Sequence, residues 1–292
     1  MAFTNGITST VELDSSLLTA VDQTVQLELA NNTVFDGLAQ IQISLNAKSI
    51  ELRRYARLGA ATTPLSETSD IDSATLSDTK IVLTPKEYGN VVTTTSLVSL
   101  QTGGVADLVA GAVIGANAAL TQDTLAYNAL KAAGAGVTAP GHMDAAFVEK
   151  LYTKLARENV QKIGNSYVLV LHEDQASDLR ASAAAGTWVD VMKYAQPGQI
   201  LINEIGMYKG FRVIVSNAVT TSGTGAATTY KAIALGANSF GKVVSKPIET
   251  RFTGPFDKLG RFVNLGWYGV FDYAVIEPKG VLVATTTAGY NE

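Results

Sequence analysis

Hydrophobic residues recur at helical spacing along Gly103–Ala133. An unbroken helix of this length would extend about 45 Å. Its apolar positions share one face, at the three- and four-residue spacing of an amphipathic helix. These positions are Val105, Leu108, Val109, Ala112, Val113, Ala116, Leu120, Tyr127 and Leu130. The pattern predicts one long helix, or two consecutive ones, whose apolar face is covered by a sheet.

A single carboxylate interrupts this helical pattern. Asp123 falls on the apolar face, and Thr121 could cap a second helical segment. We therefore expect the helix to bend or break between Asn117 and Thr121. The small residues Gly111, Ala112, Gly115 and Ala116 are expected to let the closing strands pack closely against it.

Before the helix, the pattern changes to that of strands. Ser49–Tyr55 and Lys80–Leu83 are predicted strands, and the acidic, Ser/Thr-rich segment Ser66–Thr79 separates them. Tyr88–Leu100 follows and is rich in β-branched residues, which favour strands. A two-stranded hairpin that stands off a domain is marginal in water, and its polar edges invite pairing with another chain. This segment therefore indicates a function in an assembly.

After the helix, the pattern predicts a compact α/β unit. Asp144 can cap a helix over Ala145–Asn159, and the continuous apolar run Tyr167–Leu171 is typical of a buried central strand. Gly134–Gly141 is expected to be a small-residue linker and Ala218–Thr229 a mobile loop. Further elements are expected as a helix at Glu173–Ala185, a short amphipathic stretch at Trp188–Tyr194, and strands at Phe211–Ser216, Tyr230–Leu235, Pro247–Thr253, Phe262–Tyr273 and Val281–Thr285.

These elements divide the chain into five parts. The first is an arm with a short amphipathic helix at Leu17–Leu29, which is too thin to bury its own apolar face. The parts are residues 1–35 (arm), 36–100 (extended hairpin and flanking strands), 101–141 (long helix), 142–240 (compact α/β unit) and 241–292 (closing strands).

Composition and charge exclude several classes of protein. The 292 residues carry a net charge of −4 and have no run of Lys or Arg, which argues against dedicated nucleic-acid binding. The chain has no cysteine, which excludes disulfides and thiol catalysis. The N-terminus does not resemble a signal peptide, and the longest uncharged apolar run, Leu108–Ala116, is far below the roughly 20 residues of a membrane span. We expect no membrane contact.

Candidate catalytic and metal-binding residues are few. His172 and Glu173 follow a buried strand, so a soluble α/β enzyme centred on them is one hypothesis, but the sequence has no nucleophile elbow. The alternative is that His172 ends the strand or caps the next helix. No nucleotide-binding loop or zinc motif is present. Four carboxylates could hold a hard cation or form a solvated loop tip: Glu67, Asp70, Asp72 and Asp78. We expect no catalytic residue, no cofactor and no metal.

The most charged spot of the extended region is Arg53-Arg54-Tyr55. It could form salt bridges with carboxylates of a neighbouring subunit, or it could be a solvated basic face. The candidate inter-subunit contact residues are Arg53, Arg54, Tyr55, Glu67, Asp70, Glu87 and Tyr88.

Short motifs in a fixed order resemble a known family. Arg53–Leu65 and Thr84–Gln101 resemble the major capsid proteins of tailed bacteriophages, close to the phage N-four type. Ile114–Asp123 is similar to the spine helix of that family, and Tyr167–Arg180 is similar to its central strand–helix unit. One departure is Ser66–Thr75, where the family usually has Glu-Gly and then Pro.

The resemblance implies the α+β Hong Kong 97 fold, with an N-terminal arm, an extended E-loop hairpin, a P-domain with a long spine helix, and an α/β A-domain. It implies that 1–35 is the arm, 36–100 the E-loop and flanking P-domain strands, 101–141 the P-domain spine helix, 142–240 the A-domain and 241–292 the C-terminal P-domain strands. It implies a major capsid protein, not an enzyme, that self-assembles as pentamers and hexamers into an icosahedral shell around phage double-stranded DNA. The implied partners are further copies of the chain, a portal, and a scaffolding or decoration protein. The implied location is the virion, after assembly in the host bacterial cytoplasm. An encapsulin-like nanocompartment of the same fold is the alternative.

Overall fold

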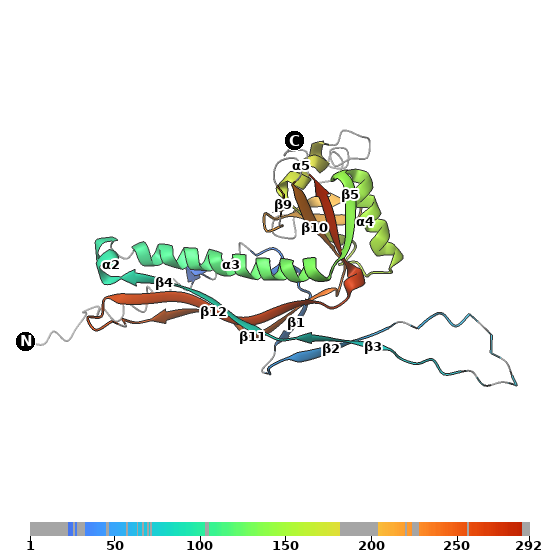
Figure 1. The fold of residues 1–292 in the computed structure, drawn as a ribbon, viewed down its shortest axis with the longest axis horizontal. Helices are drawn as coiled ribbons and strands as arrows, with labels where there is room; N and C mark the ends of the chain where they lie inside the picture. The colour runs from blue at the N-terminus through green and yellow to red at the C-terminus, as the bar shows by residue number, and fades with distance from the viewer. Residues whose placement is uncertain are drawn as a thin grey trace, which may run out of the picture.

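A computed structural model gives the fold of the chain. It describes residues 23–25, 27, 33–44, 47–56, 58–62, 64–65, 67–68, 70, 72–102, 105–181, 204–219, 221–223, 228–255 and 257–287. Within these residues the strands form a four-stranded sheet, a seven-stranded sheet and a separate hairpin. In Figure 1 the long helix lies along the four-stranded sheet, the seven-stranded sheet stands at one end of that helix, and the hairpin extends away from both.

The four-stranded sheet combines segments from both ends of the chain. Its order is β1 (Ile41–Ser44), β11 (Phe240–Thr253), β12 (Phe262–Val275) and β4 (Lys86–Thr95). β1 runs parallel to β11, and the other pairs are antiparallel. Glycine is required where β4 meets β12, because a Cβ at Gly89 or Gly266 would lie 2.7 or 2.6 Å from a carbonyl oxygen of the opposite strand. These two strands therefore approach closely.

The first half of the long helix packs on this sheet with the face opposite to the one predicted, whereas Tyr127 and Leu130 of its second half are buried as predicted. After a short α2 (Ser96–Thr102), α3 (Val105–Ala133) contacts β12 and β4. Val109 and Leu120 are 56% and 60% exposed, whereas Ile114 is 2% exposed. The prediction was wrong here because the first half of α3 is apolar on both sides. The buried positions of α3 are Ala110, Gly111, Ile114, Gly115, Ala118, Ala119, Gln122, Asp123, Ala126, Tyr127 and Leu130.

The predicted break in the helix is also absent, since α3 runs continuously from Val105 to Ala133, about 44 Å. The Thr121 hydroxyl donates to the carbonyl of Asn117 at 2.8 Å, so it bonds back within the helix and caps nothing. Asp123 does not force a break, because backbone groups from another part of the chain satisfy its carboxylate.

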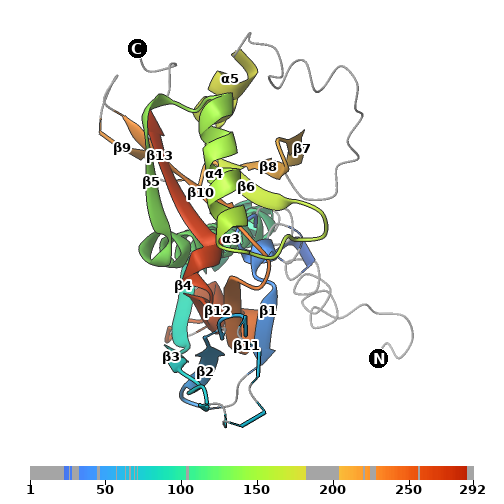
Figure 2. The same cartoon turned by 90° about the vertical axis from the view of Figure 1, so that its right-hand side faces the viewer.

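The seven-stranded sheet is covered on both faces. Its order is β5 (Ala135–His142), β13 (Val281–Thr287), β10 (Thr229–Leu235), β6 (Tyr167–Leu171), β8 (Phe211–Val215) and β7 (Glu204–Tyr208), and β9 (Thr221–Ser222) also pairs with β10. One face packs on α4 (Ala145–Arg157) through Leu151 and Leu155. The other face packs on the C-terminal half of α3 through Tyr127 and Leu130. Figure 2 shows α4 in front of this sheet.

Several sequence predictions for this unit are confirmed. Asp144 caps α4 by accepting a hydrogen bond from the Phe147 backbone N–H at 2.7 Å. All five residues of β6 are buried, as expected for a central strand. The next helix, α5, covers Glu173–Ala181, and the rest of the predicted helix, 182–185, lies outside the described residues. The Trp188–Tyr194 stretch lies outside the described residues, as do parts of the Ala218–Thr229 loop.

Three segments differ from expectation. The predicted linker Gly134–Gly141 is largely the strand β5, which pairs with β13 at the edge of the sheet. Its small residues are tolerated there because an edge strand needs only one partner. β13 lies in the seven-stranded sheet and not beside β11 and β12, so the closing strands of 241–292 divide between two sheets. The predicted strand Tyr88–Leu100 ends at Thr95, because the helix α2 begins at Ser96.

The two chain crossings between the sheets are hydrogen-bonded together. The Gly236 N–H donates to the carbonyl of Gly280 at 2.8 Å, at the end of the short 3-10 helix η3 (Pro278–Gly280). The Ile276 N–H donates to the carbonyl of Ser239 at 2.8 Å. These bonds join the β10–β11 connection to the β12–β13 connection and fix the two sheets relative to each other.

The predicted hairpin is confirmed. β2 (Ile50–Tyr55) pairs antiparallel with β3 (Asp78–Leu83) in a register that places Arg54 opposite Thr79. Most of the arm, 1–35, lies outside the described residues. The short 3-10 helix η1 (Asp36–Leu38) follows the arm and leads into β1.

Candidate assembly surfaces

One ion pair ties the root of the hairpin to the body. Arg54 lies on β2, and its Nη1 is 2.9 Å from Oε1 of Glu277, next to η3. The guanidinium and the carboxylate are about one-third exposed, 32% and 36%. A pair of this exposure contributes roughly 0–1 kcal/mol, so it orients the hairpin more than it stabilises the fold.

The other charges of β2 also have partners within the chain. Arg53 Nη1 is 3.1 Å from Oδ2 of Asp78 across the hairpin, and Lys80 pairs with Glu51. Tyr55 is exposed. The isolated subunit therefore provides acceptors for both arginines of the Arg53-Arg54-Tyr55 motif, and their contact with a neighbouring subunit stays a prediction.

The loop between β2 and β3 carries three carboxylates and one cation, Arg57 at its start. We call residues 58–77 the acidic tip. Glu67, Asp70 and Asp72 lie in it, and it contains no Lys, Arg or His. These three residues are exposed. Among the residues described, no group of three His, Cys, Asp or Glu is arranged to hold a metal ion. The tip therefore presents carboxylates to solvent.

Glu87 and Tyr88 lie on β4, beside the hairpin root, and have different environments. Tyr88 packs its ring on Phe271 with 5.1 Å between the ring centres. Burial raises the pKa of the Tyr88 hydroxyl above its ordinary value, and the nearby Asp272 adds to the shift. Glu87 is exposed. Tyr88 thus has a structural role in the subunit, whereas Glu87 is accessible to a partner.

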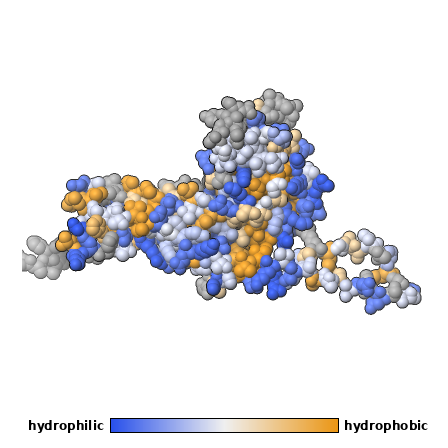
Figure 3. All heavy atoms as spheres, in the orientation of Figure 1, coloured by the Kyte–Doolittle hydropathy of each residue, from blue (hydrophilic) through white to orange (hydrophobic). Residues whose placement is uncertain are grey.

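The outward side of α2 and the first half of α3 is apolar and uncharged. Its exposed side chains include Leu97, Leu100, Val109, Val113 and Leu120. Figure 3 shows apolar residues gathered along this part of the molecule. Exposed apolar patches of this kind are typical of interaction surfaces.

Among the described residues, no single helix is both long and apolar enough to cross a membrane. α2 and α3 reach the required composition only together, across a bend of 110°.

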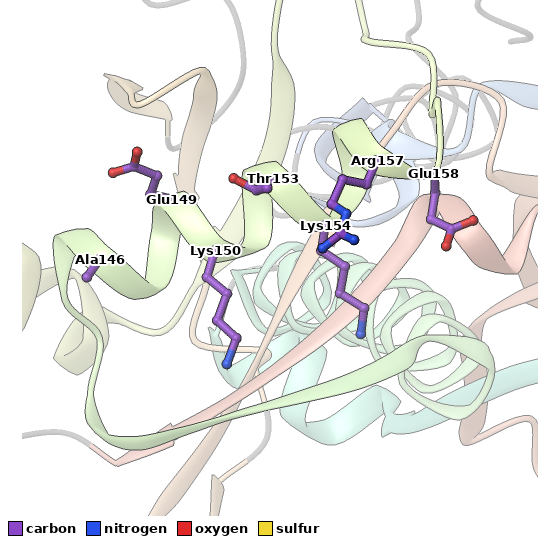
Figure 4. A pocket seen from close by; sticks show the side chains of 7 residues that line it. All are labelled: Ala146, Glu149, Lys150, Thr153, Lys154, Arg157 and Glu158. Atoms are coloured by element: carbon purple, nitrogen blue, oxygen red, sulfur yellow. The ribbon is translucent and has the colours of Figure 1, made fainter.

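The outer side of α4 carries three cations that the sequence predictions missed. Lys150, Lys154 and Arg157 are exposed and line an open groove of about 820 Å³, which Glu149 and Glu158 also line. We call these three residues the basic face of α4. In Figure 4 Lys150 and Lys154 extend from the same side of the helix, and Glu149 points the other way. Their spacing of four and three residues, opposite the buried side chains of α4, is the signal that could have identified them.

The role of Asp123 was also missed: it anchors the segment that leads from the arm into η1. Its side chain is 4% exposed. The carboxylate accepts hydrogen bonds from the backbone N–H groups of Val34, Phe35 and Asp36, at 2.8 to 3.3 Å. Burial raises the pKa of the Asp123 carboxyl to about 6, although these hydrogen bonds act in the opposite direction.

Polar contacts around Asp36 extend this anchor to the four-stranded sheet. The Asp36 carboxylate pairs with Lys242 of β11 at 2.6 Å and accepts a hydrogen bond from the Tyr273 hydroxyl of β12. The Phe35 ring packs against the Tyr127 ring of α3, with 5.3 Å between the ring centres. The chain that leads out of the arm is therefore fastened to both the helix and the sheet.

His172 is accounted for by local structure. It directly follows β6, and its Nδ1 accepts a hydrogen bond from the Asp174 backbone N–H at 3.2 Å, in the first turn of α5. This is the geometry of a helix cap, the alternative considered from the sequence. Its ring also packs against Tyr230.

Comparisons with known proteins agree with this arrangement. The family model "Phage capsid protein" matches residues 99–284, which is more than half of the chain. No curated protein matches the sequence.

Solved capsid structures share the fold. The capsid of Ralstonia phage GP4 has a TM-score of 0.70 at 12% identity, covering 89% of this chain and 90% of the other. A structure of Mycobacterium phage Che8 has a TM-score of 0.59 at 17% identity, covering 88% and 90%. A virus-like particle from Pyrococcus furiosus has a TM-score of 0.60 at 10% identity, covering 91% and 98%. Identities this low show the fold alone. Together, these neighbours give the Hong Kong 97 type α+β architecture, and the family model shows that the chain belongs to the phage capsid proteins.

Proposed function

We propose that this major capsid protein forms the pentamers and hexamers of an icosahedral shell that encloses phage double-stranded DNA. The hairpin carries the proposal. It extends away from both sheets, its strands pair only with each other among the described residues, and its exposed apolar residues include Leu58, Leu65 and Leu76. A hairpin of this kind is only marginally stable in an isolated subunit. Its free edges can pair with neighbouring subunits once these surround it.

We assign the parts of the subunit as follows. The E-loop corresponds to the β2–β3 hairpin and lies over a neighbouring subunit, with Arg53, Arg54 and Tyr55 at its root. The P-domain corresponds to α3 with the four-stranded sheet, and the A-domain to the seven-stranded sheet with α4 and α5. β5 and β13 are grouped with the A-domain because they hydrogen-bond within its sheet. The arm, residues 1–35, braces the E-loop.

The mechanism of such a shell is geometric and needs no catalysis. Symmetry repeats each modest contact many times, so no single pair of subunits has to bind strongly. The net charge of −4 suits a wall that encloses DNA without gripping its phosphates. We further propose a portal and a scaffolding or decoration protein as partners, and assembly in the host cytoplasm before the protein becomes part of the virion. The narrower resemblance to the phage N-four type stays a prediction.

Removing the tip of the hairpin tests this assignment. We expect that deletion of Ser66–Ser77 leaves a folded subunit, because this segment contributes no buried side chain among its described residues. The deleted subunit should fail to form shells. Thermal unfolding measures folding, and sedimentation on a density gradient measures assembly. A deletion variant that assembles like the wild type would contradict the role of the hairpin, and one that unfolds would show that the hairpin belongs to the core.

DNA enclosure needs its own test. Particles recovered from the natural host should protect double-stranded DNA from nuclease until the shell is disrupted. Particles that contain protein cargo and no DNA would instead support an encapsulin-like compartment.

A further inference from the structure

A line of side chains runs along α3 at the spacing of a helix–helix contact. Successive members of this line are separated alternately by four and three residues. They are Val109, Val113, Ala116, Leu120, Asp123 and Tyr127. This is the heptad spacing at which one helix packs its side chains between those of a second helix. The spacing therefore suits a second helix laid along α3.

The chain itself covers the C-terminal end of this line. The Asp123 carboxylate accepts hydrogen bonds from the backbone N–H groups of Val34 and Phe35, and the Phe35 ring packs on Tyr127. Asp123 is 4% exposed and Tyr127 is fully buried. The four earlier positions are exposed. We call these four residues, Val109, Val113, Ala116 and Leu120, the open strip of α3.

The open strip is apolar, and its surroundings on the helices are uncharged. No charged residue lies between Asp107 and Asp123 in the sequence, and α2 has none. The Asp107 carboxylate accepts a hydrogen bond from the Ser99 hydroxyl of α2 at 2.8 Å, which ties α2 to the start of α3. α2 adds Leu97 and Leu100, which are 60% and 80% exposed. A partner of this surface therefore needs apolar side chains of its own, and charge takes no part in the recognition.

The size of this surface argues for a small, reversibly bound partner. The exposed Val and Leu side chains of the strip and of α2 present on the order of 300 Å² of apolar surface. A stable pair of globular subunits buries about 800 Å² on each partner, which is well above this area. One helix of about three turns covers the strip, since Val109 to Leu120 extends about 17 Å along the axis.

The shape of the subunit also favours a separate helix over a second copy of the chain. In Figure 1 the seven-stranded sheet stands at one end of α3, on the side opposite to the four-stranded sheet. The open strip faces that same side, because its line continues to Tyr127, whose hydroxyl donates to the Lys231 carbonyl of β10 at 3.0 Å. A second α3 would bring its own seven-stranded sheet with it. A single helix therefore has better access to the strip than a whole subunit.

We propose that the open strip of α3 binds an amphipathic helix of a second protein, whose contacting face has apolar side chains at heptad spacing and no charge. This inference rests on the proposed function and assigns a binding surface to the assembly partner named there. The contact belongs to the class in which an amphipathic helix lays its apolar anchors on a complementary surface. Its strength should depend little on salt, because exposed charges are not part of it.

Peptide binding to the unassembled full-length subunit tests the proposal. The probe is a synthetic peptide of three heptads, with leucine and alanine at the contact positions and glutamine, serine and lysine elsewhere. We call it the heptad peptide. A second peptide has the same composition with its leucines at every second position, so it forms no apolar helix face. We expect the heptad peptide to bind at least about tenfold more tightly, because burial of one valine side chain contributes that much affinity. Fluorescence anisotropy measures both affinities.

Two matched substitutions locate the binding site. Val113 is 57% exposed in the centre of the strip, and Val91 is 56% exposed on β4. Val91 faces away from α3, because the adjacent Asn90 bonds to Asn117 of α3 and alternate strand residues face opposite sides. Val113→Asp should weaken binding of the heptad peptide by about tenfold, since a carboxylate is costly to bury on an apolar face. Val91→Asp should leave the binding unchanged.

Further measurements keep the outcomes distinct. Circular dichroism checks that each variant is folded, and the milder Val113→Ser should weaken binding in the same direction as Val113→Asp. No binding of the heptad peptide, equal binding of the two peptides, or equal effects of the two aspartate substitutions would overturn the proposal. Dimers of the wild-type subunit that Val113→Asp dissociates would also overturn it, because the strip would then join copies of the chain. Failure of the wild type to form shells would instead count against the proposed function.

A disulfide cross-link gives an independent test, because the chain contains no cysteine. A subunit with V113C should form a disulfide with a heptad peptide that carries one cysteine at a contact position. A subunit with V91C, oxidised in the same way, should give little cross-linked product. Equal cross-linking of the two variants would contradict the binding of the helix on α3.

Discussion

Asp123 is a buried carboxylate that folding makes harder to ionise. Its pKa is raised to about 6 from the ordinary value of 3.8, chiefly by burial. Between these two pH values the Asp123 carboxyl keeps its proton in the folded state, whereas it has lost the proton in the unfolded state. The stability that this difference contributes is complete below pH 3.8 and is lost as the pH rises through 6.

The pH dependence of Asp123→Asn tests this account. The shift corresponds to about 3 kcal/mol in the free energy of unfolding. We expect the wild-type subunit to lose up to this amount, relative to Asp123→Asn, as the pH rises from 4 to 6.5. Urea unfolding of unassembled subunits at several pH values measures the difference, and the other titrating groups cancel in it. A difference that does not vary with pH would contradict the raised pKa.

The sequence identified Asp123 as a charged residue on an apolar helix face, but it did not reveal the role of that residue. Its partners, the N–H groups of Val34, Phe35 and Asp36, lie nearly ninety residues earlier in the chain. A local pattern cannot reveal such a partner, so a break in the helix was the only local explanation. The cap at Asp144 could be predicted because its donor, Phe147, is three residues away.

At the scale of elements, α3 shows where periodicity is ambiguous. The helix itself follows from the sequence, and so do β6 and α4. The buried face does not, because Val109 and Val113 are as apolar as Ile114. Small residues decide the outcome: Gly111 and Gly115 lie on the buried side and let the helix approach β12. Larger side chains remain on the outside, where they enlarge the exposed apolar surface.

Two alanine substitutions on adjacent positions test the orientation of α3. Ile114→Ala should lower the free energy of unfolding by about 2–5 kcal/mol, as expected for a buried side chain that leaves a cavity. Val113→Ala should change it by less than about 0.5 kcal/mol, because Val113 is 57% exposed. Chemical denaturation of the unassembled subunit measures both values. The reverse order would restore the face predicted from the sequence.

At the scale of the whole molecule, the order of the parts was predictable and the contacts between them were not. The extended hairpin, the long helix and the compact α/β unit each follow from local pattern. The division of the closing strands between two sheets does not, because β12 and β13 are both apolar and only their pairing distinguishes them. The surroundings of the basic face of α4 were missed for a related reason, because Glu149 and Glu158, which line the same groove, pair with Lys209 and Lys279 from distant parts of the chain.

The central claim is that this chain builds a closed shell from copies of itself. Negative-stain electron microscopy of the purified protein at high concentration tests it most directly. We predict hexamers, pentamers and closed icosahedral particles. The 43–93 segment, which contains the β2–β3 hairpin and its flanking residues, should be protected from protease only after assembly. A protein that stays strictly monomeric at high concentration, with its 43–93 segment already resistant to protease, would contradict the claim.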